Sequence, residues 1–306
     1  MKEKITSIKG YSILIPIYNQ SVVRLVKNLY KQAKQLNIPF EILCFDDQSK
    51  NSYKIKNKEL SSLMGVNYME LSENLGRAKI RNWLVKSAGF DVVICLDGDS
   101  KVVSQNFIAT YLKAYSDNSV ISGGRIYSKS KPKAKSKLLH WMYGTTKESK
   151  PASIRNKYPF NYFHTNNFMA EREILIQHPY DEGIEGYGYE DLLMGNDLRR
   201  SKIQILHIDN PIEHLGLENS VEFAKKTFEA TQNLAEINSN RRVLKTRMVR
   251  TSTALRDWGL EKSFIAYIGK RQDSWLASLQ SDKPSIFRLQ CLKLYHYLEN
   301  NPHKLW

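Results

Sequence analysis

Apolar residues in the first part of the chain follow two alternating patterns. Continuous runs rich in β-branched residues predict strands, and apolar positions recurring every three or four residues predict amphipathic helices. The expected strands are Tyr11–Ile17, Phe40–Phe45, Val66–Leu71, Asp91–Leu96 and Ser119–Ser122. The expected helices are Ser21–Leu36, Arg77–Ala88 and Phe107–Tyr115. Buried strands that alternate with helices are typical of an α/β fold, in which a mostly parallel sheet is flanked by helices.

The pattern changes after residue 124. Residues 125–157 are rich in Lys, Ser and Pro, which predicts either a solvated surface loop or a mobile basic lid beside an anionic site. Compact character then returns, with a short helix expected over Arg172–Gln177, a longer one over Tyr189–Arg200 and a strand over Lys202–Ile208. From Ser220 onward we expect two or three amphipathic helices that form a C-terminal extension.

The composition of the 306-residue chain adds a constraint on its partners. Lys and Arg number 46 against 31 Asp and Glu, which gives a formal net charge of +15. A chain this basic is expected to meet nucleic acid, an anionic membrane, or a substrate that carries phosphate or carboxylate groups. With 42% hydrophobic residues, the chain is also able to fill a sizeable core.

The cysteines and the hydropathy bear on the expected compartment. Cys44, Cys95 and Cys291 are far apart and lack the spacing of metal ligands, and two of them lie inside expected strands. We read them as buried thiols in a reducing compartment. No segment reaches the roughly 18 uninterrupted apolar residues of a membrane span, so we expect a cytoplasmic protein.

Polar motifs follow three of the expected strands, and two of them carry paired carboxylates. The motifs are Pro16-Ile-Tyr-Asn19, Phe45-Asp-Asp-Gln-Ser49 and Leu96-Asp-Gly-Asp-Ser100. In open parallel sheets, ligands bind outside the carboxyl ends of the strands, so these motifs are expected to converge. Two carboxylates separated by one residue suit a hard divalent cation such as Mg²⁺ or Mn²⁺. The glycine between them, Gly98, permits a tight turn and close backbone approach.

Two common nucleotide-binding signatures are missing from the sequence. There is no Gly-x-Gly-x-x-Gly after the first strand and no Gly-Lys-Thr phosphate loop. This argues against a dinucleotide-dependent dehydrogenase and against a P-loop NTPase. Neutralisation of a phosphate is therefore expected from a metal ion and from basic side chains.

Together, the motifs resemble those of family 2 glycosyltransferases of the GT-A fold, which invert configuration and carry an Asp-x-Asp metal motif. The resemblance covers about residues 10–216. Besides the three strand-end motifs, it includes Asn74-Leu-Gly-Arg-Ala-Lys-Ile-Arg-Asn82, Asn166-Asn-Phe168, Glu171-Arg-Glu173, Gly186-Tyr-Gly-Tyr-Glu-Asp191 and His214.

The resemblance implies a binding site for a nucleotide-sugar donor. Pro16 and Tyr18 would frame the base, Asp47 would accept a hydrogen bond from it, and Asp97 would lie beside the ribose. The segment from Gly76 to Arg81 would close over the nucleotide, with Arg77 or Arg81 near it; an ion pair that orders the motif is an equal reading for Arg81. The full set of implied donor-binding residues is Pro16, Tyr18, Asn19, Asp47, Gly76, Arg77, Arg81, Asp97, Gly98 and Asp99.

The resemblance also implies a catalytic base and a metal site. Asp191 would deprotonate the acceptor hydroxyl, while Glu190 would contact the acceptor or support the loop; alternatively, both are simply favourable acids in a first helical turn. Asp99 would coordinate Mn²⁺ or Mg²⁺, and His214 would be a distal ligand of the same metal, a structural His being the alternative. Residues expected to line the acceptor site are Asn166, Asn167, Phe163 and Trp141.

These expectations combine into one predicted enzyme. A catalytic domain would span residues 1–219, with a nucleotide-sugar-binding half at 1–124, a basic loop at 125–157 and an acceptor half at 158–219. Residues 220–306 would form a helical extension. The enzyme would transfer a sugar from a nucleotide-diphosphate donor, most simply a UDP-sugar, to a hydroxyl of a glycan or lipid-linked acceptor, as in polysaccharide biosynthesis.

Other functions remain open at this point. The alternatives are a nucleotidyltransferase and a non-catalytic basic protein that binds nucleic acid or glycan. The first usually carries a glycine-rich loop after strand one, and no recognised nucleic-acid motif supports the second. The Gln-x-x-Arg-Trp run of processive synthases is also absent, which favours transfer of a single sugar or polymerisation with a partner. The basic surplus allows an anionic acceptor or peripheral contact with an anionic membrane.

Overall fold

The computed structural model describes residues 8–183, 188–239, 244 and 246–300. The chain forms two compact units. The sheet unit comprises Met1–Ser128, Glu148–Glu182 and Met194–Gly216, and the helical unit comprises Lys129–Lys147, Gly183–Leu193 and Leu217–Trp306. Lys129–Lys147 therefore groups with the C-terminal helices, whereas the sequence placed it within a basic loop of the catalytic domain.

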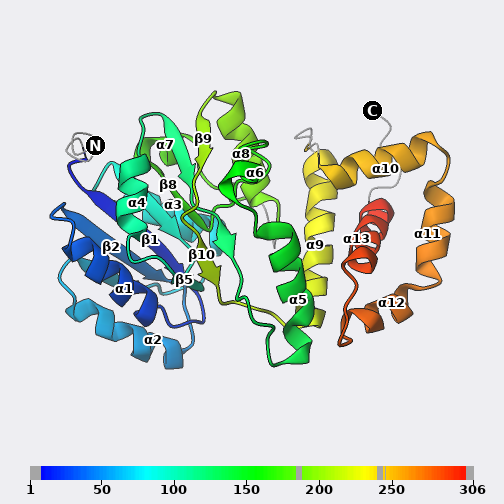
Figure 1. Ribbon diagram of the computed structural model, residues 1–306, viewed down its shortest axis with the longest axis horizontal. Coiled ribbons are helices and arrows are strands. Elements are labelled where there is room, and N and C mark those ends of the chain that lie inside the picture. The colour runs from blue at the N-terminus through cyan, green and yellow to red at the C-terminus, as the bar shows by residue number, and fades with distance from the viewer. Residues whose placement is uncertain (1–7, 184–187, 240–243, 245, 301–306) are drawn as a thin grey trace. The chain divides into compact units, whose positions relative to one another are not determined.

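The sheet unit is built on a seven-stranded sheet with the order β3-β2-β1-β4-β8-β6-β9 (Figure 1). Strand β8 is antiparallel to both of its neighbours, and the other strand pairs of this sheet are parallel. The strands are β1 (Tyr11–Ile17), β2 (Phe40–Asp46), β3 (Val66–Glu70), β4 (Val92–Leu96), β6 (Ser119–Ser122), β8 (Asn167–Glu171) and β9 (Gln204–His207). The predicted α/β fold with a mostly parallel sheet is confirmed.

Helices cover both faces of this sheet because successive side chains of a strand point to opposite faces. On one face, Ile13 and Ile15 pack with residues of α1 (Val23–Lys34) and α4 (Phe107–Ala114). On the other, Leu14 packs in a cluster with α3 (Arg77–Ser87), α7 (Arg172–Gln177) and the second half of α8 (Glu190–Arg200). The thiols of Cys44 and Cys95 are buried in these two cores, as expected.

A second, three-stranded sheet lies in the same unit and has the order β5-β10-β7. Its strands are β5 (Ser100–Val102), β7 (Arg125–Ile126) and β10 (Ile212–His214). They are too short to give a clear hydrophobic pattern, and they were not predicted. Two further elements, α2 (Asn51–Asn57) and the 3₁₀ helix η1 (Lys58–Ser62), follow β2.

The region 125–157 is not a plain loop, which corrects the prediction. It contains β7, the 3₁₀ helix η2 (Lys135–Lys137), α5 (Leu138–Tyr143), the π-helical turn η3 (Gly144–Glu148) and α6 (Ala152–Arg155). Leu138, Leu139 and His140 are buried, so a local apolar cluster stabilises α5 despite the surrounding lysines.

The helical unit contains more helices than expected. Besides α5, it holds α9 (Ser220–Ser239), α10 (Arg247–Asp257), α11 (Glu261–Gly269), α12 (Gln272–Leu279) and α13 (Ile286–Asn300), drawn from yellow to red in Figure 1. A core that includes Leu139, Phe223, Ile268 and Leu292 joins α5, α9, α11 and α13. Within the described part of the chain, no helix is long and apolar enough to span a bilayer.

Candidate functional site at the strand ends

The strand-end motifs meet at one edge of the main sheet. Strands β2, β1 and β4 are adjacent and parallel, so the loops that follow them emerge side by side. Asn19 connects the loop after β1 to the loop after β2 through two hydrogen bonds. Its backbone N–H donates to Ser49 Oγ (2.7 Å), and its Oδ1 accepts from the Lys50 N–H (2.9 Å). Pro16 is half-buried at this edge, whereas the ring of Tyr18 is 57% exposed.

Asp46 and Asp47 perform different local tasks. Asp46 is fully buried and accepts hydrogen bonds from the Ser49 N–H (2.6 Å) and the Tyr68 hydroxyl (3.1 Å), so it closes the turn. Asp47 accepts from the N–H groups of Leu75 (2.6 Å) and Gly76 (3.0 Å). These bonds hold the loop before α3 against the strand ends.

The carboxyl group of Asp47 is in an unusual electrostatic environment. Burial raises its pKa, and this effect and the nearby Asp46 charge outweigh the two backbone hydrogen bonds that lower it. Gly76 adopts φ = 83°, a backbone conformation that L side chains rarely adopt. A glycine at this position therefore lets the chain turn toward Asp47 before α3 begins.

Asp97 forms a short ion pair with Arg81. The distance from Arg81 Nη2 to Asp97 Oδ1 is 2.5 Å, and the Arg81 side chain is only 8% exposed. The guanidinium also lies 5.4 Å from the centre of the Tyr180 ring. The structure thus supports the ion-pair reading of Arg81, which fixes the Asp97 carboxylate in one orientation.

A pocket opens beside this ion pair. Its lining combines apolar side chains from β1, α3 and β4 with the charged pair and two further polar residues. The lining residues are Leu14, Pro16, Arg81, Leu84, Cys95, Leu96, Asp97, Thr165 and Tyr180. Three of the predicted donor-binding residues, Pro16, Arg81 and Asp97, therefore share one concave surface.

Asp99 and His214 are brought together by the small sheet. Strand β10 pairs antiparallel with β5 so that His214 lies opposite Ser100, the residue after Asp99. The Leu215 N–H donates to the Asp99 carbonyl (2.9 Å), and His214 Nδ1 lies 3.4 Å from Asp99 Oδ2. These contacts place the imidazole directly beside the carboxylate.

Two glycines make the close packing around Asp99 possible. A Cβ at Gly216 would overlap the Asp99 carboxylate, and one at Gly98 would overlap the Gln20 amide and lie 3.1 Å from the Pro16 carbonyl oxygen. The structure thus supports the predicted reason for Gly98. Gly216 was not singled out from the sequence, because a glycine just after a strand is also an ordinary turn residue.

The charges around Asp99 favour its ionised form. Burial alone would raise the pKa of Asp99, but hydrogen bonding to His214 and electrostatic interactions with His214, Arg125 and Arg77 bring it below its ordinary value. Arg125 is itself fixed by an ion pair with Glu148 (3.0 Å), which also accepts a hydrogen bond from Tyr127. Asp99 is therefore a carboxylate at neutral pH and available to a cation.

The Asp99–His214 pair fits a divalent metal. If two ligand atoms each lie about 2.1 Å from an ion and form a right angle at it, they are roughly 3 Å apart. The observed distance from His214 Nδ1 to Asp99 Oδ2, 3.4 Å, is close to this value. A carboxylate oxygen and an imidazole nitrogen suit Mn²⁺. Within the described residues there is no group of three or more His, Cys, Asp or Glu side chains able to hold a metal, so water and a bound phosphate would complete the coordination.

Two of the predicted acceptor residues have structural roles instead. Asn167 is fully buried: its Oδ1 accepts from the Tyr111 hydroxyl (2.6 Å), and its Nδ2 donates to the Gly124 and Asn210 carbonyl oxygens. Phe163 is 1% exposed within the apolar core. The predicted contact of these two side chains with an acceptor is corrected accordingly.

The other two acceptor candidates remain predictions. Asn166 is 4% exposed, and its buried Oδ1 has no hydrogen-bond partner among the residues that the structure describes. Its carbonyl oxygen accepts from the Asp97 N–H (3.0 Å). Trp141 is half-buried and lies on α5 in the helical unit.

Glu190 and Asp191 occupy the first turn of α8. The Glu190 carboxylate accepts a hydrogen bond from the Gly188 N–H (3.0 Å), which stabilises the turn before the helix. Asp191 is half-buried. Gly186 and Tyr187 of the quoted motif lie outside the described residues.

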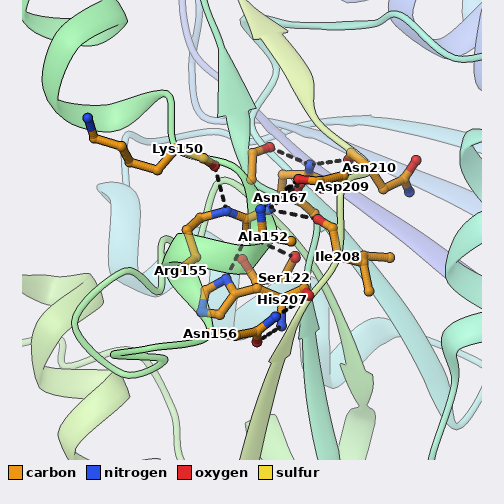
Figure 2. A network of polar contacts seen from close by, with 12 residues as sticks. Ser122, Lys150, Ala152, Arg155, Asn156, Asn167, His207, Ile208, Asp209 and Asn210 are labelled. Atoms are coloured by element: carbon orange, nitrogen blue, oxygen red, sulfur yellow. Dashed lines mark hydrogen bonds and ion pairs between the residues drawn. The ribbon is translucent and has the colours of Figure 1, made fainter.

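A buried polar network centred on Arg155 was not predicted from the sequence (Figure 2). The guanidinium donates to the carbonyl oxygens of Lys150, Ser122, Gly123 and Ile208 and to Nδ1 of His207 (2.6 Å). His207 Nε2 lies 2.9 Å from the Pro159 carbonyl oxygen. Because arginine only donates and a carbonyl only accepts, His207 is the neutral Nε2–H tautomer.

This network fixes the end of β6 and the start of the segment that leads to β10. A Cβ at Gly123 would overlap Tyr111, Asn167 and the Asn210 carbonyl, so glycine is required there. Both ring nitrogens of His207 are engaged in this network, so the residue has a structural role.

Comparison with known proteins defines the class of this molecule. The model of the family described as "Glycosyl transferase family 2" matches residues 12–178, more than half of the chain. The chain therefore belongs to glycosyl transferase family 2, and it is a glycosyltransferase with a GT-A-type fold. No curated protein sequence matches it significantly.

Solved structures share the fold at low sequence identity. The mannosyltransferase PcManGT from Pyrobaculum calidifontis, in complex with GDP-Man and Mn²⁺, is 13% identical with a TM-score of 0.57; the match covers 95% of this chain and 86% of that one. TarS 1–349 from S. aureus, in complex with UDP, is 16% identical with a TM-score of 0.50 and coverages of 95% and 90%.

Proposed function

We propose that the protein transfers a sugar from a nucleotide-diphosphate donor, a UDP-sugar in the simplest case, to a hydroxyl of a glycan or lipid-linked acceptor. The observation that carries the proposal is the convergence of Asp47, Asp97 and the Asp99–His214 pair at one edge of the sheet. The GDP-Man bound to PcManGT and the UDP bound to TarS 1–349 support this class of donor.

In this proposal the donor lies across the ends of β1, β2 and β4. Pro16 and the exposed ring of Tyr18 contact the base, and Asp47 accepts a hydrogen bond from it through a free lone pair of its carboxylate. Asp97, oriented by Arg81, accepts from a ribose hydroxyl. Arg77 and the loop at Gly76 lie on the diphosphate side.

Asp99 and His214 would hold Mn²⁺ or Mg²⁺ in this site. When bound, the metal supplies positive charge that offsets the negative charge on the departing diphosphate. Asp99 contributes an ionised carboxylate at neutral pH, since its pKa lies below the ordinary value. His214 contributes an imidazole nitrogen as the second ligand.

We assign Asp191 as the general base. Its carboxylate accepts the proton of the acceptor hydroxyl while the hydroxyl oxygen bonds to the anomeric carbon and the bond from that carbon to the diphosphate oxygen breaks. A single displacement of this kind inverts the configuration. The first turn of α8 suits this role because the positive end of the helix dipole favours an ionised carboxylate. Glu190 supports the preceding turn.

The remaining parts of the proposal concern the acceptor and the compartment. Asn166 and Trp141 are the residues we assign to the acceptor. We place the reaction in the cytoplasm, where nucleotide sugars are available, and the surplus of basic residues suits an anionic acceptor. Residues 1–219 form the catalytic domain in this proposal, and 220–306 an extension.

Calorimetric titration of nucleotides tests the donor site. We expect UDP to bind more tightly with Mn²⁺ than without it, and more tightly than GDP or CMP. Asp99→Ala should abolish the effect of the metal, whereas Asp91→Ala, an exposed acid at the opposite end of β4, should leave it intact. Tighter binding of GDP than of UDP would identify the donor as a GDP-sugar instead. If the folded wild-type protein bound none of these nucleotides, the proposal would be overturned.

A further inference from the structure

The corner between α10 and α11 exposes large apolar side chains that no part of the described chain covers. The Trp258 ring is 74% exposed and Leu260 is 47% exposed, and Gly259 stands between them. A Cβ at Gly259 would meet nothing within 4 Å, so the corner projects into open space. Burial of these side chains against a partner would remove apolar surface from water.

This corner is an ordered structure rather than a frayed helix end. Gly259 adopts φ = 67°, its N–H donates to the Arg256 carbonyl (2.9 Å), and the Leu260 N–H donates to the Leu255 carbonyl (2.8 Å). These two bonds define a Schellman C-cap. An ion pair between Arg256 and Glu261 (2.9 Å) ties the end of α10 to the start of α11. The Trp258 ring is thus presented by a preformed backbone.

Cations share the exposed face of α10 with this ring. Arg247, Arg250 and Trp258 are exposed and, at 100° per residue, fall within about 80° of one another around the helix. The buried side of α10 carries Ser252, and Met248 and Val249 pack on the core. The helix therefore lies on the unit with a face of arginines and one tryptophan turned toward solvent.

The same composition continues along α11. Lys262, Tyr267, Lys270 and Arg271 are exposed, and the Arg271 guanidinium lies 3.9 Å from the centre of the Tyr267 ring. Over residues 246–271, five exposed cations stand against one exposed carboxylate, because Glu261 is paired with Arg256 and only Asp257 is left at the surface. The excess of positive charge indicates an anionic partner, and the exposed aromatic rings indicate that this partner also offers apolar surface.

We propose that the α10–α11 corner docks the protein on an anionic lipid surface, with Trp258 and Leu260 entering the interface and the surrounding Lys and Arg side chains contacting lipid phosphates. Tryptophan favours the boundary between headgroups and acyl chains, and a projecting apolar corner enters a deformable surface without a matching groove. Basic side chains near an anionic leaflet add electrostatic attraction. This proposal does not depend on the identity of the donor.

Vesicle sedimentation with the full-length chain tests the proposal. We expect the wild-type protein to bind vesicles of phosphatidylcholine mixed with phosphatidylglycerol and to remain in solution with phosphatidylcholine alone. Trp258→Ala should lower the partition coefficient onto the anionic vesicles roughly tenfold. The double variant Arg247→Gln with Arg250→Gln should lower it roughly fivefold for each charge removed. Phe287→Ala is the matched control, because Phe287 is a 72% exposed aromatic residue at the start of α13 in the same unit.

Quenching by brominated lipid identifies the residue that enters the bilayer. The chain has five tryptophans, so Trp258→Phe keeps an aromatic ring while removing only this reporter. We expect quenching in the wild-type protein and its loss in Trp258→Phe. Undiminished quenching in that variant, equal binding to neutral vesicles, unchanged partition of Trp258→Ala, or an equal loss in Phe287→Ala would each overturn the proposal. Binding to heparin but not to vesicles would also overturn it, in favour of an anionic polymer.

Discussion

His214 Nδ1 lies 3.4 Å from Asp99 Oδ2 because β10 pairs with β5, two strands that are far apart in the sequence. The pair is held from three directions: by the strand register, by the bond from the Leu215 N–H to the Asp99 carbonyl, and by the absence of a side chain at Gly216. A metal arriving here would find both ligands already oriented.

Removal of the imidazole should weaken metal binding without emptying the nucleotide site. We expect His214→Ala to lower the affinity for Mn²⁺ by at least 10–100-fold, the loss seen when even the groups that support metal ligands are changed. Calorimetry of Mn²⁺ in the presence of UDP measures this loss. His178→Ala, outside the strand-end site, serves as the control, and unchanged affinity in His214→Ala would refute the ligand assignment.

Replacement of the proposed base should separate binding from chemistry. We expect Asp191→Asn to retain donor binding and to lose transfer by about 10²–10⁴-fold, because an amide cannot accept the acceptor proton. Initial rates of sugar transfer, together with calorimetric donor affinity, test this. Asp197→Asn changes an acid later on the same helix and should leave both quantities near the wild-type values. Full turnover in Asp191→Asn would require a different base.

Arg155 should contribute more to stability than any exposed arginine. In Arg155→Ala, the buried carbonyl oxygens of Ser122 and Ile208 and Nδ1 of His207 lose their donor. We expect the free energy of unfolding to fall by about 3–5 kcal/mol. Urea denaturation measures this change. Arg24→Ala, on the exposed side of α1, should change it by less than about 0.5 kcal/mol, and equal effects of the two variants would contradict the structure.

Acid should weaken the fold through His207. Burial, with smaller contributions from Arg155 and His164, lowers its pKa to about 4 in spite of the Pro159 carbonyl. As the pH falls from about 6.5 toward 4, the unfolded chain binds a proton that the folded protein refuses, so the free energy of unfolding decreases, on the order of 2–3 kcal/mol. Above pH 6.5 this residue contributes no pH dependence. Urea denaturation at several pH values across this range measures the effect. The free energy of unfolding should depend less steeply on pH in His207→Gln than in His178→Gln.

Long periodic segments made most of the fold predictable. β1 matches the expected strand at both ends, and α1, α3 and α4 fall within a few residues of their predicted bounds, because their apolar residues line one helix face or fill a whole strand. β5, β7 and β10 escaped prediction because two or three residues carry no periodicity. α5 was missed because its buried Leu138 and Leu139 are surrounded by lysines.

The candidate site was predictable where residue type alone determines the chemistry. Asp47, Asp97 and Asp99 all follow strands and all lie at the expected edge. Residues of ambiguous type were harder to assign. An asparagine in an aromatic segment suits sugar binding, but Asn167 is enclosed by Tyr111, Gly124 and Asn210, and only the pairing of β8 with β4 and β6 shows this.

The Arg155 network also has a kinetic consequence. Its acceptors include the carbonyl oxygens of Ser122 and Ile208, which come together only after β6 and β9 have paired. Contacts between such distant segments form late in folding, since loop closure must precede them. The guanidinium therefore stabilises the native state through contacts that form after the strands have paired. Arg155→Ala should accelerate unfolding far more than it slows refolding, and the lifetime of the native state, more than its rate of formation, depends on this one side chain.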